Sequence, residues 1–516
     1  MLERERDMEM EEESGKVSIY KAARSIKRRE NSLYNALRSI YDDSIFVGEI
    51  SELWPQLPLV ANLRCGLWYR PRFHATCYFK STDGHSNNCS FNTSRLNLHL
   101  ALLAATKGGC MIVDSTRRGK RFPDSMSRTI PIWTCVLNRA IRDFKNDWDC
   151  SLNLPLWIPQ TEKASIENRL DEWTQRLKDS GADIASIAAC LRKPLRPLWI
   201  SHKTVIWLNE VPHHDSWDFT PIILISASAS ASASASSSSG VSVSQQHRTT
   251  SEFSWNYIPG AGDDEESWAR GLTPVLFWNH VYDIINAGPH LCNHMVADIV
   301  EKSRVNRAYR GENAPQITLK PTTSPSLSHQ EPLCLSTNTA DISGTHHELR
   351  ITWLGSTNVA LASSQIAADA VDIDCVLNCD RDSISVSLPS TEAYLHLPIL
   401  GSKFDRFSLL NNLPSAVRFA KLNLSQGKRL LVCCHNGEDI SVCVCLAILM
   451  SLFDEKGSYD DGKSFSVTRV TKWDMRRRLV YVCKFATNAR PSRGNLRQVF
   501  NFLIGGNGVQ PPPIDE

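Results

Sequence analysis

The sequence contains no apolar run long enough to cross a bilayer, and its N-terminus is charged where a secretory signal peptide would be apolar. It also has almost no excess charge: 57 Lys and Arg face 55 Asp and Glu, and a net charge of +2 does not by itself indicate a nucleic-acid binder. Its 16 Cys include no C-x-x-C pair at zinc-ligand spacing. We therefore expect a protein of the cytoplasm or nucleus that has no membrane segment and keeps its thiols reduced, mostly in its core.

A length of 516 residues exceeds a single typical domain and predicts several folded units. Two stretches rich in Ser, Ala, Thr or Pro are not expected to pack. The first interrupts an apolar, strand-like segment at 221–225 and is interpreted as a loop insertion, whereas the second separates two unlike halves. We predict a disordered acidic segment 1–15, an N-terminal domain 16–309 with an insertion at 226–250, a linker 310–348, a C-terminal domain 349–505 and a tail 506–516.

Basic side chains gather in two segments. Residues 17–40 carry apolar side chains at helical spacing, with Lys27, Arg28 and Arg29 among the basic residues between them. Such a face is either solvated or in contact with an RNA backbone, and its pattern favours neither. A second cluster near the C-terminus contains Arg476, Arg477 and Arg478. We predict that both clusters are RNA-binding surfaces.

A phosphate-binding layout occupies residues 427–450: an apolar strand, a short loop and an apolar helix. Backbone N–H groups of such a loop converge on one point and the helix N-terminus adds partial positive charge, so phosphate is the expected ligand. Glu438 and Asp439 repel a bare phosphate unless a divalent cation bridges them or they face sugar hydroxyls, and both conditions suit a magnesium-bound sugar pyrophosphate. The predicted phosphate-binding residues are Cys434, His435, Asn436, Gly437, Glu438, Asp439 and Ser441.

The C-terminal half resembles a dual-specificity protein phosphatase domain, from VLNCD (376–380) through YLHLPI (394–399) to the loop and helix at 489–503. In this alignment Cys434 takes the place of the nucleophile, but Ile440 stands where these phosphatases have an arginine. That arginine grips two phosphoryl oxygens in the transition state, whereas isoleucine has neither charge nor donors. The expected general acid is also absent. We infer that the loop binds phosphate without hydrolysing it; the alternative is a domain that keeps only a scaffolding role.

Polar motifs also mark the N-terminal half. In YFKSTDGH (78–85), Lys80 is a candidate anion ligand and Asp83 or His85 a candidate general base, although Asp83-Gly84 is equally a common hairpin turn. DSTRRGKR (114–121) follows an apolar strand, so its cations are expected at a strand's carboxyl end, where α/β proteins bind ligands. A nuclear-localisation signal is the competing interpretation. The predicted phosphate ligands of this motif are Arg117, Arg118, Lys120 and Arg121.

An acidic motif follows a flexible Gly-Ala-Gly in YIPGAGDDEESW (257–268). Its adjacent carboxylates, Asp263 and Asp264, are predicted to hold magnesium or a ribose diol. An exposed acidic turn is the alternative.

Several of these motifs together resemble the initiator tRNA phosphoribosyltransferase family of fungi and plants. They are YFKSTDGH, RLNLHL, VDSTRRGKRFPDS with TIPIW, and GAGDDEESWA with GLTP. The resemblance spans most of residues 15–300 and continues into the phosphatase-like half. It implies an α/β chain, with an α+β N-terminal part, that transfers 5-phosphoribosyl from phosphoribosyl pyrophosphate to the 2′-hydroxyl of a T-stem adenosine in initiator methionine tRNA, which keeps that tRNA out of elongation.

Such a transfer leaves positive charge on the donor ribose as pyrophosphate departs, so the enzyme must neutralise the leaving group, orient the hydroxyl and exclude water. We assign the 117–121 cations and Mg²⁺ to pyrophosphate, and Asp83 or His85 to the proton. A monomer is expected. Two other hypotheses are a phosphatase, against which Ile440 argues, and a non-catalytic RNA-binding adaptor, for which the basic clusters would suffice.

Overall fold

The computed structural model describes residues 33–117, 120–213, 215–229, 247–249, 253–311, 317–319, 351–402, 404–467 and 470–505. These residues form two compact units: the first contains the described residues up to Phe91, Leu100–Trp173 and Ala185–Arg304, and the second contains Asn92–His99, Thr174–Ile184 and the described residues from Val305 onwards. The predicted segments 1–15 and 506–516, most of 226–250 and of 310–348, and the predicted ligands Lys27, Arg28, Arg29 and Arg118 lie outside the described residues. No helix within these ranges is both long enough and apolar enough to span a bilayer.

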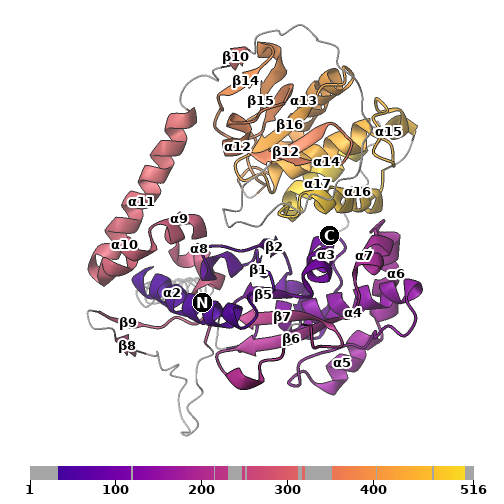
Figure 1. Ribbon diagram of the computed structural model, residues 1–516. Helices are drawn as coiled ribbons and strands as arrows, with labels where there is room; N and C mark the ends of the chain where they lie inside the picture. Colours follow the sequence, from indigo (N-terminus) through magenta and orange to yellow (C-terminus); the bar gives the residue numbers. More distant parts are fainter. Residues whose placement is uncertain are drawn as a thin grey trace, which may run out of the picture. The chain divides into compact units, whose positions relative to one another are not determined.

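The first unit is built on a five-stranded parallel sheet in the order β2-β1-β5-β7-β6 (Figure 1). Strands β5 and β7 are buried at every position and apolar except at Asp114, Thr220 and Ser226, as expected where both faces of a parallel sheet are covered. They confirm the strands predicted at 110–113 and 221–225. The bounds are β1 Leu59–Asn62, β2 Ala75–Cys77, β5 Cys110–Asp114, β6 Leu195–Ser201 and β7 Thr220–Ser226, and the short hairpins are β3 Gly84–His85 with β4 Asn88–Cys89 and β8 His247–Thr249 with β9 Ser254–Asn256.

Helices surround this sheet. Helix α2 contributes Leu37 and Ile40 to a core that also contains Met111 and Val113 of β5. Side chains alternate along a strand, so Ile112 faces the opposite layer. The helices between residues 33 and 311 are α2 Leu33–Leu53, α3 Leu98–Lys107, α4 Ile130–Ile141, α5 Gln160–Glu167, α6 Leu170–Asp179, α7 Ile184–Cys190, α8 Glu265–Trp268, α9 Pro274–Asn279, α10 Val281–Asn286 and α11 Gly288–Gly311.

The order of the strands creates a switch point between β1 and β5. From β1 the chain goes outwards to β2, then crosses to β5 on the other side of β1, so successive connections leave in opposite directions. In α/β proteins the carboxyl ends of strands at such a point form a ligand-binding crevice. Asn62 ends β1 and Asp114 ends β5, and the Asn62 amide donates a hydrogen bond to the Asp114 carboxylate at 2.8 Å. The DSTRRGKR motif therefore begins at the switch point.

The second unit has a mixed sheet in the order β11-β12-β16-β13-β15, parallel except for β11. The expected strand–loop–helix at 427–450 is confirmed as β16, a loop and α14. Helices α13, α14, α16 and α17 pack together beside the sheet (Figure 1). The α/β class is thus confirmed, and the N-terminal part, expected to be α+β, also has an entirely parallel main sheet. The bounds are β10 Ile317–Leu319, β11 Thr352–Trp353, β12 Val359–Ser363, β13 Cys375–Asn378, β14 Val386–Leu388, β15 Tyr394–His396, β16 Leu430–Cys434, α12 Ser364–Ala368, α13 Ser408–Leu424, α14 Ile440–Leu452, α15 Lys463–Val467, α16 Lys472–Phe485 and α17 Arg493–Gly505.

Candidate active site

The buried carboxylate of Asp114 holds the loops at the switch point together. It is fully buried and accepts hydrogen bonds from the Asn62 amide and from the Ser125 hydroxyl at 2.6 Å. Arg64 approaches both carboxylate oxygens, at 3.2 Å through Nε and at 3.1 Å through a terminal nitrogen. This two-point contact fits the planar guanidinium to the carboxylate. The loop after β1, the loop after β5 and the turn that begins at Ser125 are therefore locked to one another.

The Gly-Ala-Gly turn brings the predicted acidic pair to this cluster. Gly260 has φ +66°, and a β-carbon on it would overlap the backbone carbonyl of Thr116, so only glycine allows this close approach. The approach places Asp263 against Arg64 and Asp264 against Arg117 as ion pairs. Burial raises the pKa of Asp263, whereas the charge of Arg64 opposes this shift. The turn, expected to be flexible, is closely packed.

The predicted magnesium site therefore consists of two carboxylates that already contact arginines. Among the residues that the structure describes, no group of three or more His, Cys, Asp or Glu side chains is placed to hold a metal ion. Magnesium, however, is usually held by one or two carboxylates together with substrate phosphates and water. Asp263 and Asp264 suit that arrangement, and their assignment stays a prediction.

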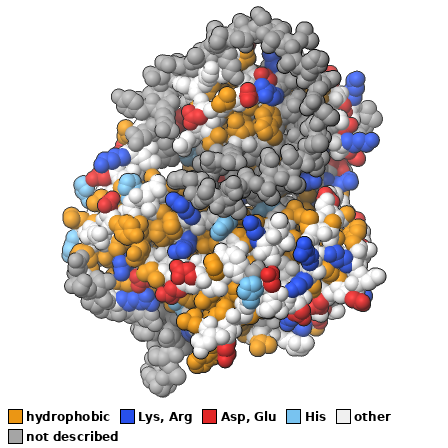
Figure 2. Space-filling model, in the orientation of Figure 1, with side chains coloured by type: hydrophobic (Ala, Val, Ile, Leu, Met, Phe, Trp, Pro, Cys, Tyr) orange, Lys and Arg blue, Asp and Glu red, His pale blue; other side chains and the backbone are white. Residues whose placement is uncertain are grey.

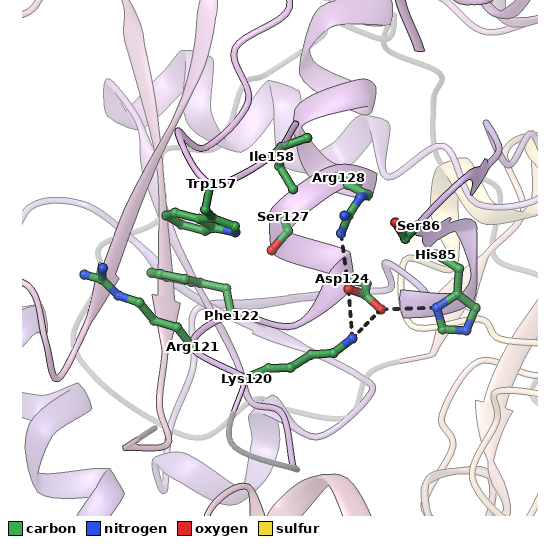
Figure 3. A pocket seen from close by; sticks show the side chains of 10 residues that line it. All are labelled: His85, Ser86, Lys120, Arg121, Phe122, Asp124, Ser127, Arg128, Trp157 and Ile158. Atoms are coloured by element: carbon green, nitrogen blue, oxygen red, sulfur yellow. Dashed lines mark hydrogen bonds and ion pairs between the residues drawn. The ribbon is translucent and has the colours of Figure 1, made fainter. Parts of the chain in front are cut away.

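A pocket of about 700 Å³ opens beside the same loops (Figure 3). Asp124 lies at its centre and contacts His85 Nδ1 at 3.1 Å, Lys120 Nζ at 3.0 Å and Arg128 at 3.3 Å. One carboxylate thus orients a histidine and two cations. The residues that line the pocket are His85, Ser86, Lys120, Arg121, Phe122, Asp124, Ser127, Arg128, Trp157 and Ile158.

Of the two candidate bases, His85 lines the pocket and Asp83 does not. His85 belongs to the β3–β4 hairpin, and its ring is half-exposed, with Nδ1 directed to Asp124 (Figure 3). Asp83 ends the preceding 3₁₀ turn, and its carbonyl accepts a hydrogen bond from Ser90. The hairpin turn considered at Asp83-Gly84 in fact lies between His85 and Asn88. Gly84 instead lies against the Asp124 backbone. A β-carbon on Gly84 would be only 2.5 Å from the Asp124 carbonyl oxygen, so a larger residue would not fit there.

The predicted cations of this half that the structure describes lie in three places. Lys120 and Arg121 line the pocket, whereas Arg117 is paired with Asp264. Arg121 donates to the hydroxyl of Ser201 at 2.8 Å, at the carboxyl end of β6. Lys80 lies 5.6 Å from the ring of Tyr78 and does not line the pocket.

A buried ion pair supports the histidine hairpin. Glu162 of α5 accepts hydrogen bonds from Arg128 at 2.7 and 3.0 Å and from the backbone N–H of Asn87 at 3.3 Å. The Arg128 hydrogen bonds lower the pKa of Glu162, so the ionised carboxylate stabilises the fold. No local sequence pattern joins Glu162, Arg128 and Asp124, so none of the three was among the predicted site residues.

We expect Glu162→Gln to lower the free energy of unfolding by about 1–3 kcal/mol near neutral pH, because Arg128 loses its charged acceptor. The pKa of Glu162 is lower in the folded chain than in the unfolded chain. The stabilisation is therefore fully present at pH values above the ordinary Glu pKa of about 4.3, and it is lost as the pH falls through the pKa of the folded state. Urea unfolding at several pH values measures the difference, which should shrink below about pH 4. Glu167→Gln, an exposed change in the same helix, is the control. A difference independent of pH would contradict the assignment.

In the second unit, polar side chains surround the Cys434 thiol in the loop between β16 and α14. Cys434 Sγ lies 3.1 Å from Ser441 Oγ, and His435 lies 3.7 Å from Asp380. Gly437 has φ +70°, and its N–H donates to the Cys434 carbonyl at 3.3 Å. Ile440 begins α14 and packs against the core.

The two acidic residues of this loop contact the segment before α17. The Glu438 carboxylate forms an ion pair with Arg490 at 2.6 Å, and the Glu438 backbone carbonyl accepts a hydrogen bond from the Arg490 backbone N–H at 2.8 Å. Asp439 accepts hydrogen bonds from the Ser492 N–H at 2.9 Å and the Asn495 amide at 3.0 Å. The Glu438 N–H is itself bonded to Asn436 at 3.1 Å. These contacts give both carboxylates a structural role; binding of phosphate by the loop stays a prediction.

The basic cluster of α16 is only partly exposed. Arg476 and Arg477 are exposed, whereas Arg478 is partly buried and donates to the backbone carbonyl of Asp454. On the face shown in Figure 2, basic and acidic side chains of the described residues are interspersed. An RNA contact by Arg476 and Arg477 stays a prediction.

Comparisons with known proteins match both units. The family model described as the Rit1 N-terminal domain matches residues 26–301, and the Rit1 DUSP-like domain matches residues 393–503. An uncharacterised protein of Schizosaccharomyces pombe is 30% identical over 92% of this chain and 95% of its own. The tRNA A64-2′-O-ribosylphosphate transferase of Saccharomyces cerevisiae is 27% identical over 95% of each chain.

Among solved structures, human DUSP28 is 20% identical, covers 30% of this chain and 93% of its own, and has a TM-score of 0.24. A mouse putative dual specificity phosphatase is 19% identical over 34% of this chain and 96% of its own, with a TM-score of 0.25. The first domain model covers more than half of the chain, and the two relatives match it over 92% and 95% of its length. The chain therefore belongs to the Rit1 family.

Proposed function

We propose that this chain transfers 5-phosphoribosyl from phosphoribosyl pyrophosphate to the ribose 2′-hydroxyl of a T-stem adenosine in initiator methionine tRNA. The observation that carries the proposal is the similarity, over 95% of both chains, to a relative named as a tRNA A64-2′-O-ribosylphosphate transferase. The pocket beside the switch point supports it with the groups that such a reaction needs. The modified tRNA would be excluded from elongation by the added bulk.

The His85–Asp124 pair is suited to the proton of the attacking hydroxyl. Asp124 holds Nδ1, so the other ring nitrogen, Nε2, is the one that accepts the proton as the 2′-oxygen bonds to C1 of the donor ribose. Asp124 also stabilises the imidazolium that forms. The proton thus moves from the tRNA hydroxyl to His85 while the C1–oxygen bond to pyrophosphate breaks.

The cations of the DSTRRGKR motif are suited to the donor. Arg128 is neutralised by Glu162 and Lys120 is paired with Asp124, so Arg121 leaves the pocket with one excess positive charge, which favours a phosphorylated sugar. Asp263 and Asp264 would hold Mg²⁺ together with pyrophosphate oxygens, and bound Mg²⁺ would neutralise charge on the leaving group. Arg64 and Arg117 form ion pairs with Asp263 and Asp264, respectively.

The direct test is incubation of the protein with initiator tRNA and phosphoribosyl pyrophosphate labelled in the ribose. We expect label to remain in the tRNA after the free donor is removed. We expect no label when the acceptor nucleotide carries a 2′-deoxyribose. Label that appears equally on the deoxy acceptor would contradict transfer to the 2′-hydroxyl.

The second unit is expected to have no phosphatase activity in the full chain, because Ile440 cannot hold phosphoryl oxygens. Cys434→Ser should keep most of the transferase activity, since the tRNA hydroxyl is the nucleophile.

Gly437→Val should lower the free energy of unfolding of the second unit by about 1–3 kcal/mol, because φ is +70° and a β-carbon would be 2.8 Å from the Ala362 carbonyl carbon. Aryl phosphate hydrolysis, tRNA labelling and thermal unfolding measure the three outcomes. Hydrolysis that disappears in Cys434→Ser would contradict the prediction.

A further inference from the structure

An aromatic wall lines one side of the pocket. Trp157 is 48% exposed, although its ring lies parallel to that of buried Phe122, with centroids 5.1 Å apart and an interplanar angle of 12°. Trp199 meets it edge-on, with centroids 6.4 Å apart. Ile158 lies beside it, across the pocket from His85 (Figure 3). The indole is thus supported by other aromatic rings and still partly open to the pocket.

The wall is held rigidly. The indole N–H of Trp199 donates to the Met126 carbonyl at 2.9 Å. The guanidinium of Arg121 lies 5.9 Å from the Trp157 ring centroid and 5.5 Å from that of Phe122, and is itself bonded to Ser201 at 2.8 Å. A rigid aromatic surface loses little conformational entropy when a ligand stacks on it.

The donor does not account for this surface. A phosphorylated ribose has charged groups and hydroxyls but no flat apolar face, so it would gain little from an indole. A nucleobase has such a face, and RNA-binding sites use aromatic rings and arginine planes to stack unpaired bases. The wall and His85 line one pocket, which matches a nucleotide whose ribose is at His85 and whose base lies at Trp157.

We propose that Trp157 is the stacking platform for the base of the acceptor nucleotide, which turns out of its helical stack to present its 2′-hydroxyl to His85. This inference rests on the proposed function and adds a base-binding subsite to it. Trp157 is a positioning residue, because it touches the base and not the reacting atoms. Stacking on an aromatic side chain changes affinity by about 5- to 150-fold per base.

The experiment compares wild type, Trp157→Ala, Trp157→Phe and the control Leu156→Ala, whose side chain is fully exposed and does not line the pocket. Each is measured with intact initiator tRNA and with the same tRNA carrying an abasic ribonucleotide at the acceptor position. We expect Trp157→Ala to raise Kd and KM for intact tRNA about 5- to 150-fold, to leave KM for the donor unchanged, and to cost less than about twofold on the abasic tRNA. Trp157→Phe should retain most of the affinity.

The proposal would be overturned if Trp157→Ala raised Kd and KM equally for both tRNAs, or for neither. A rise confined to KM for the donor would also overturn it. Kd for tRNA is measured by filter binding without donor, so the platform is tested even if no label is transferred. Absence of transfer by wild type would instead contradict the proposed function. Thermal unfolding of each variant separates loss of stacking from loss of fold.

Discussion

Replacing His85 by Gln is expected to lower kcat for transfer to tRNA by about 10²–10⁴, the usual contribution of a general base. Gln keeps a polar side chain of similar reach, but it cannot accept the proton at neutral pH. Because Asp124 orients the ring through Nδ1, the loss should appear in kcat more than in KM for the donor. Single-turnover labelling of initiator tRNA measures it.

Asp83→Asn is the matched control, since Asp83 is two residues away and outside the pocket. It should leave kcat within a few-fold of wild type. Asp124→Asn should lower kcat as well, because it removes the acceptor that fixes His85 and leaves Lys120 and Arg128 without their shared carboxylate. An active His85→Gln enzyme together with an inactive Asp83→Asn enzyme would reverse the assignment.

Arg64→Met is expected to lower the free energy of unfolding of the first unit by about 3–5 kcal/mol, because it leaves the fully buried carboxylate of Asp114 without its cation. Asp263 loses the same partner. Met fills a similar volume, so the effect reports charge more than packing. Urea unfolding followed by tryptophan fluorescence measures the change.

Arg139→Met provides the comparison, because its partner Asp171 is 89% exposed and such a surface pair contributes about 0–1 kcal/mol. Adding Asp114→Asn to Arg64→Met should recover part of the loss, since no buried charge is then unpaired. Equal costs for the two arginine substitutions would contradict the buried network.

The strands and loops that carry the site were predictable where their signals are local. The apolar run before DSTRRGKR became β5, and the segment around Cys434 became a strand, a loop and a helix, because each depends on hydrophobic runs and glycines within a short window. The structural role of Glu438 and Asp439 could not be predicted from local sequence. Their partners Arg490 and Ser492 lie more than 50 residues further along the chain.

Sequence was therefore sufficient for the α/β class, for the family resemblance and for the motifs that supply His85, Lys120 and Arg121. Only the folded chain decided which polar groups share one pocket. Arg64 meets Asp114 across 50 residues and Asp263 across 199, and no short-range pattern encodes such contacts. Asp124 acquires its position in the same way, because a parallel sheet brings the carboxyl ends of distant strands, and the loops that follow them, to a single edge. Trp157 lies in the segment before α5 and is placed by packing against Phe122 and Trp199, which are also distant in the sequence.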